Sequence, residues 1–146
     1  MNLTQMLLGD RKIKEYRIGE GKSIVLQALS AEEARQVDRI VFTLFPNAAF
    51  HMEVNTARVH TLARALVSVN GIPVSQLEDV AKVLSAHKND PKYTPLEAIT
   101  QILGEQDNES INLLYSLYLD LEKENREEKE KMKNFYQAQT VDSSGK

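Results

Sequence analysis

The sequence contains no cysteine and no tryptophan, and it has only six glycines and four prolines. Without cysteine the chain has no disulfide, no thiolate nucleophile and no cysteine-ligated zinc, which fits a reducing compartment. Aromatic residues make up only 6% of the sequence, whereas hydrophobic residues make up 42%. We therefore expect a real hydrophobic core that is mainly aliphatic.

Long hydrophobic runs and an excess of positive charge are also absent. No stretch approaches the ~18 apolar residues that a membrane span needs, and the N-terminus lacks the basic region and apolar core of a secretory signal. The formal net charge is −3, so no overall positive field attracts nucleic acid. The expected protein is cytoplasmic, with no membrane or nucleic-acid partner.

Most of the chain carries the signals of helices. Three capping patterns predict helix starts: Ser30 with Glu33, Ser75 with Glu78, and Thr94 with Pro95 and Glu97. Apolar residues recur at helical spacing after each start. A further helix is expected over residues 50–69, where Asn70, Gly71 and Pro73 are typical of a helix stop.

Residues 11–29 are predicted to form a small β-hairpin, because Tyr16 and Ile18 alternate with polar residues and Gly19 and Gly21 supply the turn. The expected fold class is mainly α: a compact helical domain over residues 1–121, with this N-terminal hairpin and a long C-terminal helix. The residues expected at the centre of the core are Val37, Ile40, Val41, Leu62, Leu66, Val80, Leu84, Ile99, Ile102 and Leu114.

The last helix changes character along its length. Its first part, from Ile111 to Leu121, has an apolar stripe that can pack on the domain. Of the twelve residues 122–133, ten are charged, five of each sign. A helix of about 30 residues reaches roughly 45 Å, so residues 122–139 are expected to project as a charged helix. Residues 140–146 are predicted to be a disordered tail.

A cluster of apolar residues reappears beyond the charged stretch. Oppositely charged residues four positions apart can sustain a solvated helix without a partner, so this cluster is either a frayed end or a docking patch. We expect docking of a protein partner, with a homo-oligomer also possible. The predicted partner-binding residues are Leu117, Leu121, Met132, Phe135 and Tyr136.

No catalytic, cofactor-binding or metal-binding residues are predicted. Gly-Lys-Ser at residues 21–23 ends like a phosphate-binding loop, but Tyr16 occupies the position where that loop needs glycine. The histidines at positions 51, 60 and 87 match no spacing of metal ligands. No serine, histidine and aspartate are placed to suggest a catalytic triad. The chain is therefore not expected to be an enzyme.

The order of motifs resembles that of the small tail assembly chaperones of long-tailed bacteriophages. The similar features are Leu-Ser-Ala-Glu-Glu at residues 29–33, Val-Asn-Gly-Ile-Pro at 69–73 and Leu-Tyr-Ser-Leu-Tyr at 114–118, within roughly residues 24–125. The resemblance implies a non-enzymatic helper in the host cytoplasm that coats the tape-measure protein while tail tube subunits polymerise. One alternative is a structural tail or baseplate subunit retained in the virion. Another is a small helical DNA-binding regulator, although the acidic balance disfavours it.

Overall fold

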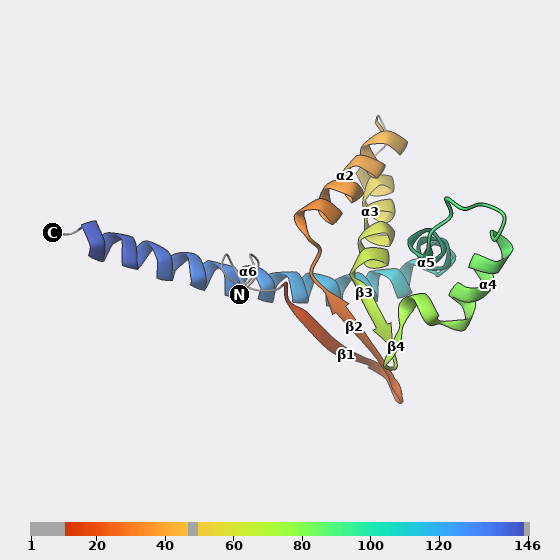
Figure 1. The fold of residues 1–146 in the computed structure, drawn as a ribbon, viewed down its shortest axis with the longest axis horizontal. Helices are drawn as coiled ribbons and strands as arrows, with labels where there is room; N and C mark the ends of the chain where they lie inside the picture. The colour runs from red at the N-terminus through yellow and green to blue at the C-terminus, as the bar shows by residue number, and fades with distance from the viewer. Residues whose placement is uncertain (1–10, 47–49, 145–146) are drawn as a thin grey trace.

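The structure, a computed structural model, describes residues 11–46 and 50–144. The strands are β1 (Ile13–Gly19), β2 (Lys22–Gln27), β3 (Leu66–Val69) and β4 (Ile72–Pro73). The helices are α2 (Ala31–Leu44), α3 (Phe50–Ala65), the 3-10 helix η1 (Val74–Gln76), α4 (Glu78–Ala86), α5 (Pro95–Gly104) and α6 (Asn108–Ser144). Figure 1 shows α2 and α3 standing side by side as an arm, while α6 runs past the sheet and far beyond the domain.

The prediction of a mainly α fold is wrong, because the N-terminal hairpin is only half of a sheet. Four antiparallel strands lie in the order β1-β2-β3-β4, so the domain combines helices with a sheet. Residues 66–69, predicted to end a helix, form β3 and pair with β2, with Ile24 opposite Val69. The predicted hairpin and long C-terminal helix are both present.

The physical reason for this error lies in the Asn-Gly pair at residues 70 and 71. Both residues have positive φ, 50° for Asn70 and 78° for Gly71, as a two-residue type I′ hairpin turn requires. Val69 pairs with Ile72 across this turn. A helix stop also places glycine at positive φ, so the dipeptide alone does not distinguish the two structures. The flanking β-branched residues are compatible with a strand, and pairing with β2 determines it.

Replacing Asn70 with alanine is expected to lower the free energy of unfolding by about 1–2 kcal/mol. Alanine tolerates positive φ less well than asparagine, and the Ser23 N–H loses the Asn70 Oδ1 acceptor that lies 2.8 Å away. Denaturant unfolding measures the loss. The matched control is Asn89→Ala in an exposed turn, which should change stability by less than about 0.5 kcal/mol. Equal effects of the two substitutions would contradict this account of the turn.

Two of the three predicted helix caps are confirmed. The Ser30 hydroxyl accepts a hydrogen bond from the Glu33 amide at 3.1 Å, and the Glu33 carboxylate accepts one from the Ser30 amide at 2.9 Å. The Thr94 hydroxyl accepts from the Glu97 amide at 3.2 Å. These side chains satisfy amides that the helix itself leaves unpaired, and they therefore define where α2 and α5 begin.

The third predicted cap, Ser75 with Glu78, is wrong. Because β4 ends at Pro73, the next three residues form the 3-10 turn η1, and Ser75 lies inside it. Helix α4 then begins at Glu78 with Leu77 as its N-cap residue, and no side chain caps it. The hairpin therefore displaces the helix start from the position that the capping pattern predicts.

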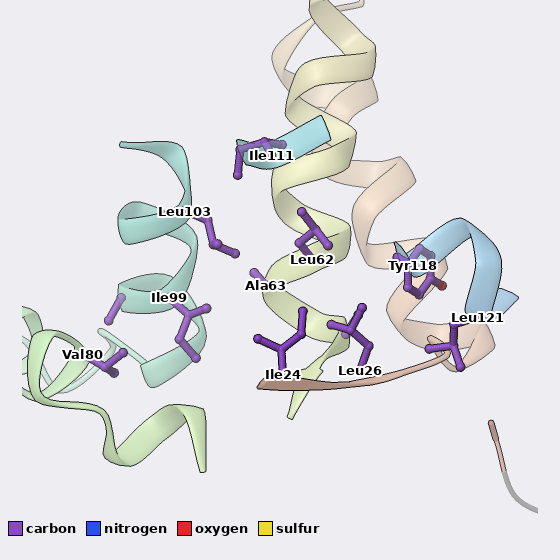
Figure 2. Packing of buried hydrophobic residues seen from close by; sticks show 12 residues of the cluster. Ile24, Leu26, Leu62, Ala63, Val80, Ile99, Leu103, Ile111, Tyr118 and Leu121 are labelled. Carbon is purple, nitrogen blue, oxygen red and sulfur yellow. The ribbon is translucent and has the colours of Figure 1, made fainter. Parts of the chain in front are cut away.

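The core lies between the sheet and the helices α3, α5 and α6 (Figure 2). Its buried members come from every layer: Ile24, Leu26, Leu62, Ala63, Ala65, Val80, Ala98, Ile99, Leu103, Ile111, Tyr118 and Leu121. Four of the ten core residues predicted from the sequence are buried: Val37, Leu62, Val80 and Ile99. The other six are half-buried, because they lie at the margins of the helices and of β3.

Candidate protein-binding surface

Strand β1 and helix α6 are joined by a row of polar contacts, which we call the β1–α6 ladder. Its bonds run from Tyr16 to Asp120 at 3.1 Å, from Lys14 to Glu124 at 2.7 Å and from Lys12 to Glu128 at 2.7 Å. Two residues of a strand advance about 6.7 Å and four residues of a helix about 6 Å, so antiparallel elements match at each step. Among the described residues, α6 thus contacts the domain at least as far as Glu128.

The two lysine contacts of the ladder favour the charged form of each lysine. The hydrogen bond between Lys12 and Glu128 raises the pKa of the lysine and lowers the pKa of the carboxylate. The hydrogen bond to Glu124 likewise raises the pKa of Lys14. Because these side chains are partly exposed, the ladder fixes the direction of α6 more than it stabilises the fold.

Two of the predicted partner-binding residues belong to the domain. Leu121 has 0% of its surface exposed and is part of the core, and Figure 2 shows it beside Leu26 of the sheet. Leu117 is half-buried against the same core. The periodicity correctly places both residues on an apolar stripe, but that stripe faces inward, so Leu121 offers no surface to a partner in this fold.

The other predicted residues lie on the part of α6 that extends beyond Glu128. Met132 is half-buried, whereas 59% of Phe135 is exposed. The side chain of Tyr136 lies outside the described residues. Residues 140–144, predicted as a disordered tail, continue α6, since Gly145 is the first helix breaker after residue 121. Residues 145–146 lie outside the described residues.

A second apolar surface lies on the arm formed by α2 and α3. A groove of about 390 Å³ is lined by Asp38, Val41, Phe42, Phe45, Pro46, Val54 and Ala57. Phe42 is 75% exposed, and Leu44, two residues further along α2, is also exposed. This surface was not predicted from the sequence, because the apolar stripe of α2 indicated a core-facing side and Phe42 lies just off that stripe. The sequence feature that could have indicated this surface is the pair Phe42 and Phe45, two aromatic residues three positions apart at the end of a helix.

Two further grooves lie among the described residues. A groove of about 360 Å³ contains His60 and Thr100, and burial, with a smaller effect from Arg64, lowers the pKa of His60. A groove of about 270 Å³ contains Tyr115 and Glu122. Within residues 11–46 and 50–144, no group of three or more histidines and carboxylates is placed to hold a metal ion.

Comparisons with protein-family models, curated proteins and solved structures give no match for this chain. Among the helices of the described residues, none combines the length and the apolar character needed to cross a membrane. A functional proposal therefore depends on the surfaces of the domain and of α6.

Proposed function

We propose that this protein is a non-enzymatic assembly factor that binds a helical protein partner through the far end of α6. The observation that carries the proposal is the position of Met132 and Phe135 beyond Glu128, where the ladder ends. They are three residues apart, so they lie close together on the helix surface, and Phe135 is 59% exposed. An amphipathic partner helix docks on such a stripe through its own apolar face.

Within this class, a tail assembly chaperone for a phage tape-measure protein is the function that the sequence resemblance supports. A tape measure is a long helical chain that tends to aggregate, so its chaperone needs an apolar contact surface on a highly charged and well-solvated element. The far part of α6 combines these properties, since Met132 lies among Lys129, Glu130, Lys131 and Lys133. Such a chaperone acts in the host cytoplasm and leaves before the particle is complete.

Replacing Met132 and Phe135 together with glutamine is expected to weaken capture of the tape-measure protein at least tenfold. Burial of one such side chain contributes about 1.5–3 kcal/mol, and about 1.4 kcal/mol is a factor of ten in affinity. Glutamine keeps the helix propensity high. Co-expression followed by pull-down and calorimetric titration measures the change. The matched control is Glu130→Gln with Lys133→Gln, two exposed positions nearby, which should leave capture within a few fold.

A truncation after Lys131 separates partner binding from folding. It removes Met132 and Phe135 but keeps Asp120, Glu124 and Glu128, so the ladder remains. The truncated chain should melt like the full chain and fail to capture the partner. Capture equal to that of the full chain would place the binding surface elsewhere, with the groove of the arm as the next candidate. Presence of the protein in purified virions would favour the retained tail or baseplate subunit instead.

A further inference from the structure

Strand β1 forms the outer edge of the sheet. The strand order begins with β1, so no strand of the described residues lies beyond it, and Figure 1 shows no labelled element along that edge. The strand is seven residues long, whereas β4 at the opposite edge has two. An open edge of this length presents a row of backbone donors and acceptors to another strand.

The hydrogen-bond pattern identifies which residues of β1 face outward. The Lys12 carbonyl accepts from the Ala28 amide of the neighbouring segment at 2.9 Å. Because the groups of successive residues point to alternate sides of an antiparallel strand, the N–H and C=O groups of Ile13, Glu15 and Arg17 point away from β2. The partners of these three residues are Gln27, Val25 and Ser23, which form the non-hydrogen-bonded pairs of this ladder.

The two faces of β1 differ in whether their charged side chains form ion pairs. On the face towards α6, Lys12 and Lys14 are paired with carboxylates of that helix. On the opposite face, Glu15 and Arg17 are exposed, and neither forms an ion pair with another described residue. These two charges, which have no ionic partner among the described residues, have opposite signs and lie two residues apart on the same face of the strand.

We propose that a second copy of this chain adds its β1 antiparallel to this edge, with a two-fold axis at Tyr16. In this register Glu15 lies opposite Arg17 of the second copy, and the pair occurs twice by symmetry. The outward-facing backbone groups of these residues then pair directly. The two four-stranded sheets become one continuous sheet.

Charge complementarity determines both the register of the added strand and the kind of chain that supplies it. A two-fold axis at Glu15 would place Glu15 opposite its own copy, and like charges directly opposite each other destabilise a sheet. An axis at Lys14 would leave Glu15 opposite Ile13 without an ionic partner. The axis at Tyr16 gives each charged residue on the open face of β1 an ionic partner. Glu15 of each copy lies opposite Arg17 of the other copy. A second copy therefore fits this edge without requiring another protein.

Charge reversal with rescue tests the proposed dimer. Sedimentation velocity over the micromolar range should show the 16.5 kDa native chain in reversible equilibrium with a dimer. Glu15→Lys or Arg17→Glu alone turns two attractive pairs into two repulsive ones and should raise the dimer dissociation constant about tenfold or more. The double variant restores opposite charges and should return the constant to within a few fold of the native value. Circular dichroism checks that each variant is folded.

The matched control is Glu105→Lys, which makes the same charge change at an exposed residue at the end of α5, outside the paired strands. It should leave the dissociation constant within a few fold of the native value. A native chain that stays monomeric throughout the micromolar range would overturn the proposal. So would a dimer that the single reversals do not weaken, or one that the double variant does not restore. No tape-measure protein is present, so these outcomes are independent of the proposed chaperone function.

Discussion

Replacing Leu121 with alanine is expected to lower the free energy of unfolding by about 2–5 kcal/mol. The side chain has no exposed surface and belongs to the cluster that joins the sheet to α3 and α6. Its removal loses the transfer free energy of the buried methyl groups and leaves a cavity that close-packed neighbours only partly fill. Denaturant unfolding of the native and variant chains, analysed with a common slope, measures the loss.

Leu119→Ala is the matched control, since it makes the same change on the same helix at a residue that is 46% exposed. It should cost much less than the change at Leu121. If Leu121→Ala folds as stably as the native chain but loses partner capture, Leu121 is a binding residue after all, and its place in the core is wrong. A large loss of stability would instead support the inward-facing stripe.

Ionisation of Tyr118 is expected to lower the free energy of unfolding by about 2–3 kcal/mol between pH 10 and pH 12. Burial raises the pKa of its hydroxyl to about 12, above the value of about 10 in an unfolded chain. The folded state therefore favours the neutral phenol. The stabilisation that Tyr118 contributes is fully present below pH 10. It is lost as the pH rises from 10 to 12, because in this range the tyrosine of the unfolded chain ionises before that of the folded chain. Unfolding midpoints across this range measure the effect.

Tyr118→Phe is the control for this pH dependence. The hydroxyl accepts a hydrogen bond from the Leu29 amide at 3.3 Å, so the variant should lose about 1 kcal/mol at neutral pH. Its stability should then fall less steeply above pH 10. The slope does not vanish, because burial and Asp120 also raise the pKa of Tyr16 to about 12. An unchanged slope in the variant would show that Tyr118 is not the group that titrates.

Local signals in the sequence predicted the elements that depend on neighbouring residues. The capping box at Ser30 and the Thr94 cap identified the starts of α2 and α5, because such caps are satisfied within one turn of chain. The sheet could not be predicted in this way. Strand β3 continues the apolar spacing of α3 for one more turn, and only pairing with the distant β2 decides between helix and strand.

The candidate surface could be predicted only in part, because its exposure also depends on contacts that are distant in the sequence. Apolar spacing on α6 identified Leu121 and Phe135 equally, but the spacing does not say which apolar residues the rest of the fold covers. The ladder also has a sequence signature, since two lysines two positions apart, Lys12 just before β1 and Lys14 within it, match carboxylates four positions apart in α6. That match becomes informative only when the two elements are known to be antiparallel neighbours.

The ladder also sets an order of events on the ribosome. Its contacts join residues 104 to 116 positions apart in the chain, and β1 leaves the exit tunnel long before Glu128 is translated. The β1–β2 hairpin can therefore form early, whereas Lys12 and Lys14 can pair with their carboxylates only after more than a hundred further residues have been made. Closure over such sequence separations is slow. The docking of α6 on β1 is therefore a late step relative to hairpin formation, and until it occurs that face of the nascent strand is open to other acidic segments.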